Sequence, residues 1–491
     1  MPSHSQTQRL MLLRLGCSIA NMRKKHLHFV GIGGTAMAAL ARAFKAAGCR
    51  ITGSEALGRP FPPISTYLQK NKIKYYSGFN SKKVGQPDEI ITGNAFMSFK
   101  NSEIIYARKN HIPLRHYPHL IEKHLVKKNS VVVAGACGKS TITSMTAWLL
   151  DQSRKNPNYM VGGIPLNFGH GAQLTNSSWS VIEGDEYPAA SPWDCSPKFD
   201  YYHPKYLILT SAAWDHQDIY TSQASYLRIF QNLVGNMPKH GLIVANLNGD
   251  NIKQVLKKAP CRIIFYSLGR PQTKQKNIYH INDIKRNKTR IKFSLKKDGE
   301  IISVFETSLL GRFNLENWAA VLALASELKI PIKKTKEAVK TFKGVKRRLE
   351  IKHKDKITII DDLAHSPIKA RAAIETLKEN FPNNRVFVVF EPNRGSRILK
   401  NLRAYDFVFK NTFKTFIPQL TQYTNKAKFK EASGLQLAAY LKKTHRNVSF
   451  QPDQQKIINF ILKNSRTGDV AAFLGSKNFD ALIQALIKSF D

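Results

Sequence analysis

The chain has 491 residues, a length that predicts about three domains of ordinary size. Hydrophobic residues make up 42% of it and charged residues 22%, which excludes a disordered chain and allows a sizeable core. Its formal net charge of +42 favours anionic partners without choosing among them. The basic residues are spread along the whole chain, so we interpret most of them as a lysine-rich solvated surface and expect no specific nucleic-acid partner.

Cysteine usage and hydropathy bear on where the protein works. The five cysteines form no CxxC pair and no metal-binding spacing, which fits a reducing cytoplasm. No apolar run reaches the roughly 18 residues of a membrane span, so no membrane partner is expected. The apolar stretch 10–20 is short, contains Arg14 and lacks a small-residue cleavage site, which argues against a signal peptide. We treat residues 1–21 as an extension outside the fold and expect a cytoplasmic protein.

Three times the chain passes from an apolar strand through a short turn into a helix. The expected strand and helix pairs are 26–30 with 35–47, 131–134 with a helix ending at 150, and 357–361 with 369–379. Further β-rich runs lie at 180–182, 206–209, 242–245, 386–390 and 470–473. This alternation predicts α/β domains with parallel sheets covered on both faces. Residues 259–309 indicate shorter β segments, for which an antiparallel arrangement stays open. The expected domains are 22–126, 127–341 and 342–491.

The strongest single motif is GACGKST at residues 135–141, between an expected strand and an expected helix. In such a loop Gly135 and Gly138 let backbone N–H groups turn inward around phosphate oxygens, and the helix dipole adds a positive end. Lys139 supplies the counter-charge, and the hydroxyl of Ser140 is a ligand for Mg²⁺. The loop is shorter than the usual phosphate-binding sequence, so an ordinary strand–turn–helix connection is the alternative.

A glycine turn opens the first helix. Gly31 and Gly33, followed by Ala36, are arranged as in dinucleotide-binding folds, and Glu55 follows the next strand where a ribose-binding acid is expected. Close packing of the helix on the strand explains these glycines nearly as well. The motif therefore predicts a bound diphosphate but does not separate a UDP group from NAD.

Acidic residues follow two strands of the expected central sheet. Glu183, Asp185 and Glu186 follow one of them, and His216 stands with acidic neighbours after the other. The carboxyl ends of parallel strands meet where ligands bind, and a carboxylate there would hold the Mg²⁺ of a nucleotide. Ordinary polar turns are the alternative for both clusters.

Three further groups stand near the ends of expected elements. Asn314 and Asn317 lie on one face of a helix, where their amides suit an adenine edge, although N-capping by Asn314 is the simpler account. Arg348 lies in a basic pair between the second and third domains, where a solvated run is the alternative. Asp361 and His365 end a strand of the third domain and are placed to reach the same crevice.

In this order the motifs resemble those of the Mur ligase family over residues 26–480. The family uses ATP to join amino acids or peptides to UDP-N-acetylmuramate. The resemblance implies a Rossmann-like N-terminal domain for the UDP-sugar, a P-loop ATPase-like central domain, and a Rossmann-like C-terminal domain for the peptide. It also implies that ATP phosphorylates the muramoyl carboxylate and that an amine then displaces phosphate from the acyl phosphate.

The resemblance assigns roles to individual residues. Those expected to bind the UDP-sugar are Gly31, Gly33, Gly34 and Glu55. Those expected to bind ATP are Gly135, Gly138, Lys139, Ser140, Thr141, Asn314, Asn317 and Arg348. Those expected to hold Mg²⁺ are Ser140, Glu183 and His216. Those expected to be catalytic are Lys139, His216, Arg348, Asp361 and His365.

Four stretches favour the branch of the family that joins the recycled tripeptide L-Ala-γ-D-Glu-meso-diaminopimelate to UDP-N-acetylmuramate. They are residues 61–66, 93–95, 183–187, and Lys198 with Phe199. The L-alanine-adding branch usually has Ser where this chain has Tyr187. Residues 394–397 are instead similar to that branch, so it is the alternative, and a drifted non-catalytic UDP-sugar or nucleic-acid binding paralogue is a second one. We expect a monomer or a weak dimer.

The chain departs from the family pattern at several site positions. Cys137 stands in the phosphate loop where His is common, and Ser140 replaces Thr but keeps the hydroxyl. Phe313 and Ser366 each stand in place of a His, and Ser211 in place of an Asn. These departures bear on how much activity is kept.

Overall fold

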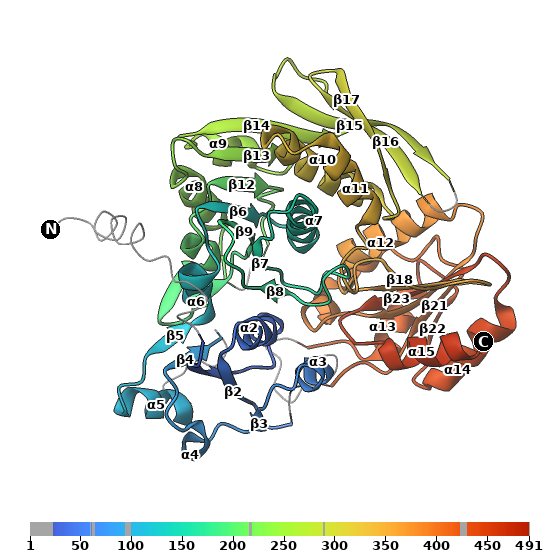
Figure 1. Cartoon of the computed structure of the whole chain (residues 1–491). Helices are drawn as coiled ribbons and strands as arrows, with labels where there is room; N and C mark the ends of the chain where they lie inside the picture. The colour runs from blue at the N-terminus through green and yellow to red at the C-terminus, as the bar shows by residue number, and fades with distance from the viewer. Residues whose placement is uncertain are drawn as a thin grey trace. The chain divides into compact units, whose positions relative to one another are not determined.

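The computed structural model describes residues 23–58, 60, 64–93, 100–215, 219–287, 290–422 and 430–490 (Figure 1). The expected extension 1–21, the stretches 61–63 and 94–95, and His216 lie outside these residues. The described chain forms two compact units. The first consists of the residues up to Ser308 together with Leu315–Lys343, and the second of Leu309–Asn314 with the residues from Gly344 onward. The expected domain boundary near 342 lies beside the end of the first unit.

The N-terminal sheet of the first unit is parallel, in the order β3-β2-β1-β4-β5. Its strands are β1 (His26–Val30), β2 (Arg50–Glu55), β3 (Tyr76–Ser77), β4 (Glu89–Thr92) and β5 (Leu114–His116). Leu27 and Phe29 of β1 pack into one hydrophobic cluster, whereas Val30 packs into another. Helices therefore cover both faces. The covering helices are α2 (Thr35–Ala46), α3 (Ile64–Lys70) and α6 (Tyr117–His124) on one face, and α4 (Ser81–Val84) and α5 (Ser102–Lys109) on the other.

The central sheet runs β17-β16-β15-β14-β13-β12-β6-β9-β7-β8 in the described residues. Its parallel strands are β6 (Asn129–Ala134), β7 (Asn158–Met160), β9 (Trp179–Gly184), β12 (Tyr206–Leu209), β13 (Leu242–Asn246) and β14 (Arg262–Leu268), with β8 (Ala172–Gln173) antiparallel at one edge. The helices are α7 (Lys139–Gln152), α8 (Gln223–Gly235), α9 (Ile252–Leu256), α10 (Arg312–Glu327) and α11 (Ile332–Thr341). The runs expected at 131–134, 180–182, 206–209 and 242–245 are thus confirmed as strands.

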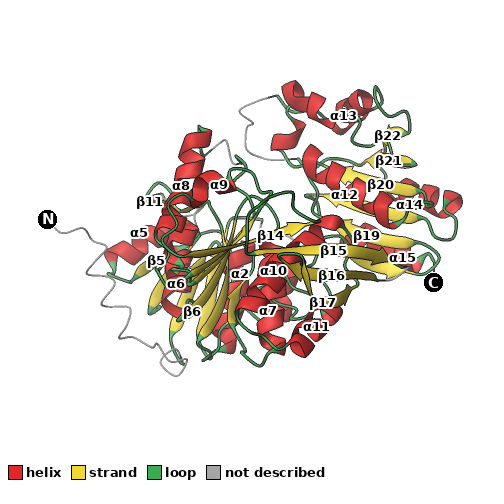
Figure 2. Cartoon of the chain, turned by 90° about the horizontal axis from the view of Figure 1, so that it is seen from above, coloured by secondary structure: helices red, strands yellow, loops and turns green. Residues whose placement is uncertain are grey.

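The prediction for residues 259–309 is only partly confirmed. β15 (Ile278–Arg286), β16 (Ile291–Lys297) and β17 (Glu300–Thr307) are antiparallel to one another, and they extend beside α10 and α11 (Figure 2). β14, however, is parallel to both β13 and β15. Ile264 and Tyr266 bury their side chains, so β14 continues the parallel interior of the sheet, where strands are covered on both faces.

The second unit contains a six-stranded sheet in the order β18-β19-β23-β20-β21-β22, parallel except for β18. Its elements are β18 (Glu350–Lys354), β19 (Thr358–Asp362), α12 (Pro367–Asn380), β20 (Val386–Glu391), β21 (Lys414–Ile417), α13 (Gly434–Leu441), β22 (Val448–Phe450), α14 (Gln454–Asn464), β23 (Val470–Gly475) and α15 (Asp480–Lys488). Along β20, Val386 and Val388 belong to one hydrophobic cluster, and Phe387 and Val389 to another. This alternation shows that both faces are covered, as predicted for an α/β domain.

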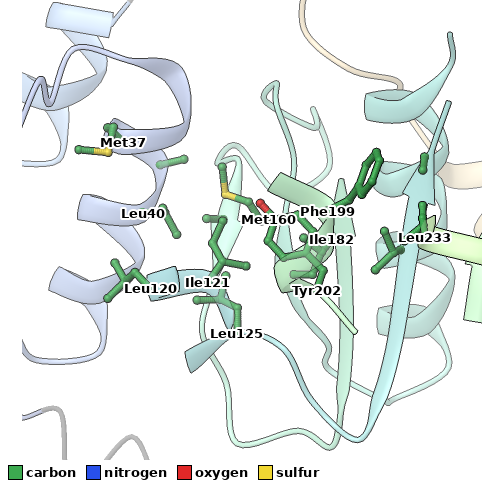
Figure 3. Close-up of a cluster of buried hydrophobic side chains, with 14 of the residues drawn as sticks. Met37, Leu40, Leu120, Ile121, Leu125, Met160, Ile182, Phe199, Tyr202 and Leu233 are labelled. Carbon is green, nitrogen blue, oxygen red and sulfur yellow. The ribbon is translucent and has the colours of Figure 1, made fainter. Parts of the chain in front are cut away.

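One hydrophobic cluster runs through both segments expected to be the first and second domains (Figure 3). It joins Leu40 of α2 and Ile121 of α6 to Met160 of β7, Ile182 of β9 and Tyr202, which follows the short 3-10 helix η3 (Lys198–Tyr201). These two segments therefore share buried apolar surface, which holds α6 against the end of the central sheet.

His124 provides a test of this packing. The side chain is 3% exposed and meets the Phe44 ring edge-on, with 5.5 Å between the ring centroids. Burial, with nearby lysines, lowers the pKa of His124 from 6.5 to about 3, so the stability it contributes is present above pH 6.5 and lost as the pH falls toward 3. Between pH 7 and 4.5 the wild type should lose about 2–3 kcal/mol more unfolding free energy than His124→Leu. Urea denaturation at both pH values measures the difference, and equal losses would contradict it.

Candidate nucleotide and metal site

The phosphate loop leaves β6 at Gly135 and enters α7 at Lys139. Gly135 has φ +126° and Gly138 has φ +74°, conformations that side chains rarely adopt. A Cβ at Gly135 would collide with the Thr210 hydroxyl, and one at Gly138 would lie 2.7 Å from Asn317 Oδ1. The two glycines therefore serve a tight turn against neighbouring side chains, as well as the close backbone approach that phosphate binding requires.

The loop is fixed by the residues that follow β12. The Ala136 N–H donates to the Ser211 carbonyl at 3.0 Å, and the Thr210 hydroxyl donates to the Cys137 carbonyl at 2.8 Å. Within the described residues no side chain caps the start of α7 at Gly138, so its first N–H groups point toward an anion site. Thr210 was not predicted as a loop partner, although its position directly after a strand that ends at the same sheet edge indicated it.

Lys139 curls back over the loop that precedes it. Its Nζ donates to the Gly135 carbonyl at 2.8 Å and to the two oxygens of Glu186 at 2.7 and 3.0 Å. Burial alone would lower the pKa of Lys139, but Glu186 and the acids beside it raise the pKa above its usual value. The side chain is thus a fixed cation at the loop.

Ser140 and Glu183 meet at the ends of neighbouring parallel strands. Glu183 pairs in register with Val133 of β6, which places it next to the loop. The Ser140 hydroxyl donates to Glu183 Oε1 at 2.9 Å, and the Gly162 N–H donates to Oε2 at 2.6 Å. Burial raises the pKa of Glu183, and these donors with Lys139 oppose the shift. A hydroxyl and a carboxylate oxygen this close fit a shared Mg²⁺, which prefers oxygen ligands.

The glycine turn of the first sheet is closed by an acid. The N–H groups of Gly31 and Ile32 donate to the Ser54 carbonyl at 2.9 and 3.0 Å. The Gly33 N–H donates to Glu55 Oε2 at 2.7 Å, and the Cβ of any larger residue at Gly33 would lie 2.5 Å from that oxygen. Glu55 therefore binds the turn itself in this structure, which gives Gly33 a packing role. Contact of Gly34 and Glu55 with a UDP-sugar stays a prediction.

The two asparagines of α10 differ in their surroundings. The helix begins at Arg312, so Asn314 lies inside the first turn, and the alternative account of Asn314 as an N-cap is wrong. Its amide instead donates to the Leu310 carbonyl at 2.7 Å. Asn317 is buried against Gly138 of the phosphate loop. The structure thus brings Asn317 to the predicted nucleotide site.

In the second unit, Asp361 lies near the end of β19, and His365 follows that strand. Burial raises the pKa of Asp361 to about 6, opposed by Arg347, whose Nε lies 3.4 Å from Oδ1. Burial lowers the pKa of His365 to about 4. Asp361 Oδ2 and His365 Nδ1 are buried and have no hydrogen-bond partner among the described residues. Such atoms are expected where a polar ligand binds.

The two arginines at residues 347–348 have different surroundings. Arg347 donates to the carbonyls of Gly475 and Lys477 at 2.7 and 2.6 Å, so it ties the ends of β19 and β23 together. Arg348 is exposed, which leaves it available to a ligand. The sequence predicted a site role for Arg348 and did not indicate the structural role of Arg347.

Among the described residues, no helix combines the length and the apolar composition that a membrane crossing needs.

Mainly parallel sheets with a phosphate loop at the end of a central strand are features of nucleotide-using α/β enzymes. Three family models match successive segments: "Mur ligase family, catalytic domain" at 26–128, "Mur ligase middle domain" at 195–325, and "Mur ligase, glutamate ligase domain" at 347–477. The chain belongs to the Mur ligase family. It is an ATP-dependent ligase of cell-wall biosynthesis that forms C–N bonds, with the three-domain α/β architecture of that family.

The chain is similar to ligases of the L-alanine-adding and the tripeptide-adding branches of the family. The UDP-N-acetylmuramate–L-alanine ligase of Dictyoglomus turgidum is 31% identical over 77% of this chain and 77% of its own length. The UDP-N-acetylmuramate–L-alanyl-γ-D-glutamyl-meso-2,6-diaminoheptandioate ligase of Haemophilus influenzae is 30% identical over 76% of this chain and 80% of its own. The UDP-N-acetylmuramate–alanine ligase structure from Thermotoga maritima matches with a TM-score of 0.76 at 24% identity, over 95% of this chain and 99% of that one.

Proposed function

We propose that the protein works in the cytoplasm and joins the tripeptide L-Ala-γ-D-Glu-meso-diaminopimelate to UDP-N-acetylmuramate during peptidoglycan recycling. The observation that carries the catalytic part is the meeting of Lys139, Ser140 and Glu183 at one sheet edge. The choice of tripeptide rests on Tyr187 and Lys198. These two branch-indicating residues come together in space, with the Lys198 ammonium 5.4 Å from the Tyr187 ring centroid.

The reaction we propose needs ATP because a carboxylate becomes a good acyl donor only after its oxygen is phosphorylated. The muramoyl oxygen forms a bond to the γ-phosphorus as the bond to ADP breaks. The peptide's amine nitrogen then attacks the carbonyl carbon, phosphate leaves with the C–O bond electrons, and the nitrogen loses a proton. Lys139 would neutralise charge on the phosphates, and the N–H groups at the start of α7 would orient them.

Mg²⁺ fits this site through the Ser140 hydroxyl and the Glu183 carboxylate. When bound, the ion would offset the negative charge of the nucleotide phosphates. Asn317, which lies beside Gly138, would contact the nucleotide, and we propose the same for Asn314 and Arg348. The buried polar atoms of Asp361 and His365 would bind the peptide. His216 remains a proposed second metal ligand.

Addition of L-alanine is the second candidate function. It is favoured by the segment 394–397 and by the Dictyoglomus turgidum relative. In this structure Arg394 and Arg397 both form ion pairs with Glu431, at 2.5 and 2.8 Å. The two arginines of this segment are therefore bound to a carboxylate of the chain itself.

An amine-specificity assay tests the proposal. Purified protein is given UDP-N-acetylmuramate, ATP and Mg²⁺ with either the tripeptide or L-alanine, and phosphate release is measured. We expect release with the tripeptide to exceed release with L-alanine by about 100-fold or more, because a site built for extended polar contacts rejects a substrate lacking them. Release with alanine alone would replace the proposal by the second candidate. Omission of UDP-N-acetylmuramate controls for ATP hydrolysis without acyl transfer.

A further inference from the structure

Lys198 is brought beside the acidic residues after β9 by a hairpin. β10 (Pro188–Ala190) and β11 (Asp194–Pro197) pair antiparallel, so the chain returns to its starting point as η3 begins. The Lys198 N–H donates to the Tyr187 carbonyl at 3.0 Å, and the Phe199 N–H donates to the Asp185 carbonyl at 3.3 Å. The backbone thus fixes the lysine against the acidic turn, independently of its side chain.

The Lys198 side chain is enclosed, and its charge is kept. Its Nζ lies 2.6 Å from Asp185 Oδ2 and 5.4 Å from the centroids of both the Tyr117 and Tyr187 rings. The residue is 8% exposed. Burial opposes the charged form, but Tyr117 and Asp185 raise the pKa of Lys198 above its usual value. A buried ammonium with one carboxylate partner and two aromatic faces is a fixed charge, because moving it would leave Asp185 unpaired.

Of the three acids at the end of β9 and just after it, two pair with lysines. Lys139 pairs with Glu186 at 2.7 Å, and Lys198 pairs with Asp185 at 2.6 Å. Glu183 has no ion pair with a lysine or arginine in the described part of the chain; its oxygens accept from a hydroxyl and a backbone N–H. Glu183, the acid proposed to hold Mg²⁺, is therefore the one of the three that forms no ion pair with either lysine.

Lys198 also connects the acidic turn to the segment expected to bind the UDP-sugar. Tyr117 is the first residue of α6, which packs against η3. Arg108 of α5 lies 4.3 Å above the Trp193 ring in the hairpin loop, and His116 Nε2 is 3.6 Å from Asp194. The hairpin is thus held from the side of the first sheet while Lys198 reaches the turn beside the phosphate loop.

We propose that Lys198 is a positioning residue for the nucleotide site: by pairing with Asp185 it prevents this acid from competing for Lys139, and so keeps Lys139 available to phosphate. The proposal rests on the proposed function, since it takes the loop as the ATP site. Without Lys198, Asp185 would be an uncompensated negative charge facing both Lys139 and the incoming phosphates, whose binding it would oppose.

Binding of ADP, measured by titration calorimetry, tests the proposal without the sugar or the amine. We expect Lys198→Met to weaken ADP binding about tenfold, which one uncompensated charge nearby can supply. Lys198→Arg should stay within about threefold of the wild type, because it keeps the charge. The double variant Lys198→Met/Asp185→Asn should recover ADP binding to within about threefold, since the opposing charge is gone.

The double variant separates a positioning role from a merely structural role. A merely structural role of Lys198 predicts that the double variant binds ADP no better than Lys198→Met does. That outcome, or wild-type binding by Lys198→Met, would overturn the proposal. If Lys198→Met does not fold, the test depends on the double variant, which is expected to fold and to bind ADP. Failure of the double variant to bind ADP would then overturn the proposal. Lys123→Met is the matched control: it removes a 3.1 Å ion pair between Lys123 of α6 and the buried Glu89 of β4, and it should bind ADP normally. Failure of the wild type to bind ADP would instead refute the proposed function.

Discussion

Lys139→Met is expected to lower ATP-dependent phosphate release by about 10³-fold or more, because it removes the lysine whose ammonium is hydrogen-bonded to the phosphate loop. The Lys139 ammonium bonds the Gly135 carbonyl and stands at the start of α7, where transferred phosphate charge would accumulate. Steady-state release with UDP-N-acetylmuramate, ATP and either amine measures the effect. Because a pure binding protein has no turnover to lose, the same assay separates catalysis from binding.

The variant has a second effect that needs its own control. Glu186 is fully buried, and loss of Lys139 breaks its 2.7 Å ion pair, which costs about 3–5 kcal/mol in folding. Lys139→Met/Glu186→Gln removes both charges and should regain most of that stability without regaining activity. Lys205→Met, which changes a lysine hydrogen-bonded to Asn129 at the opposite end of the strands, should keep full activity. Activity in the double variant would show that the loop assignment is wrong.

The strands and turns that have a clear local sequence pattern could be predicted. The apolar runs that became β6 and β20 indicated buried strands because both of their faces are covered, so they lack polar alternation. Glycines at positions 135 and 138 marked the turn because no other residue readily adopts their backbone angles. The strand order then placed Ser140 beside Glu183, as expected from the rule that parallel strands end at one edge.

The side-chain pairings across that edge could not be predicted. Lys198 meets Asp185 only because an intervening hairpin reverses the chain, and sequence spacing does not specify that return. The Gly33 N–H donates to Glu55 at 2.7 Å, a contact within the turn that the sequence spacing did not indicate, and the ribose contact of Glu55 stays a prediction. For Asn314 the sequence left an N-cap as the alternative, but the helix begins two residues earlier and the amide donates to the Leu310 carbonyl. Such outcomes depend on which polar groups the packed chain leaves unsatisfied.

Gly135→Ala is expected to lower ATP-dependent phosphate release about 100-fold, although it adds only one methyl group. At φ +126° any Cβ is strained, and this one would collide with the Thr210 hydroxyl and lie 2.8 Å from both the N and O atoms of Ser211. Thr210 and Ser211 hold the loop through the Cys137 carbonyl and the Ala136 N–H. The collision therefore separates the loop from the contacts that shape it, and misplacement of about 1 Å is enough for such a loss.

The matched control is Gly169→Ala, which sits at φ +73° with nothing within 4 Å of the added Cβ. It bears the backbone strain of a left-handed alanine, about 1–2 kcal/mol, without a collision. We expect Gly169→Ala to keep near-normal turnover and ADP affinity, whereas Gly135→Ala weakens both. Calorimetric ADP binding and thermal unfolding of the two variants make the comparison. Equal losses in both would mean that strain alone acts, and wild-type binding by Gly135→Ala would show that nucleotide phosphates are held elsewhere.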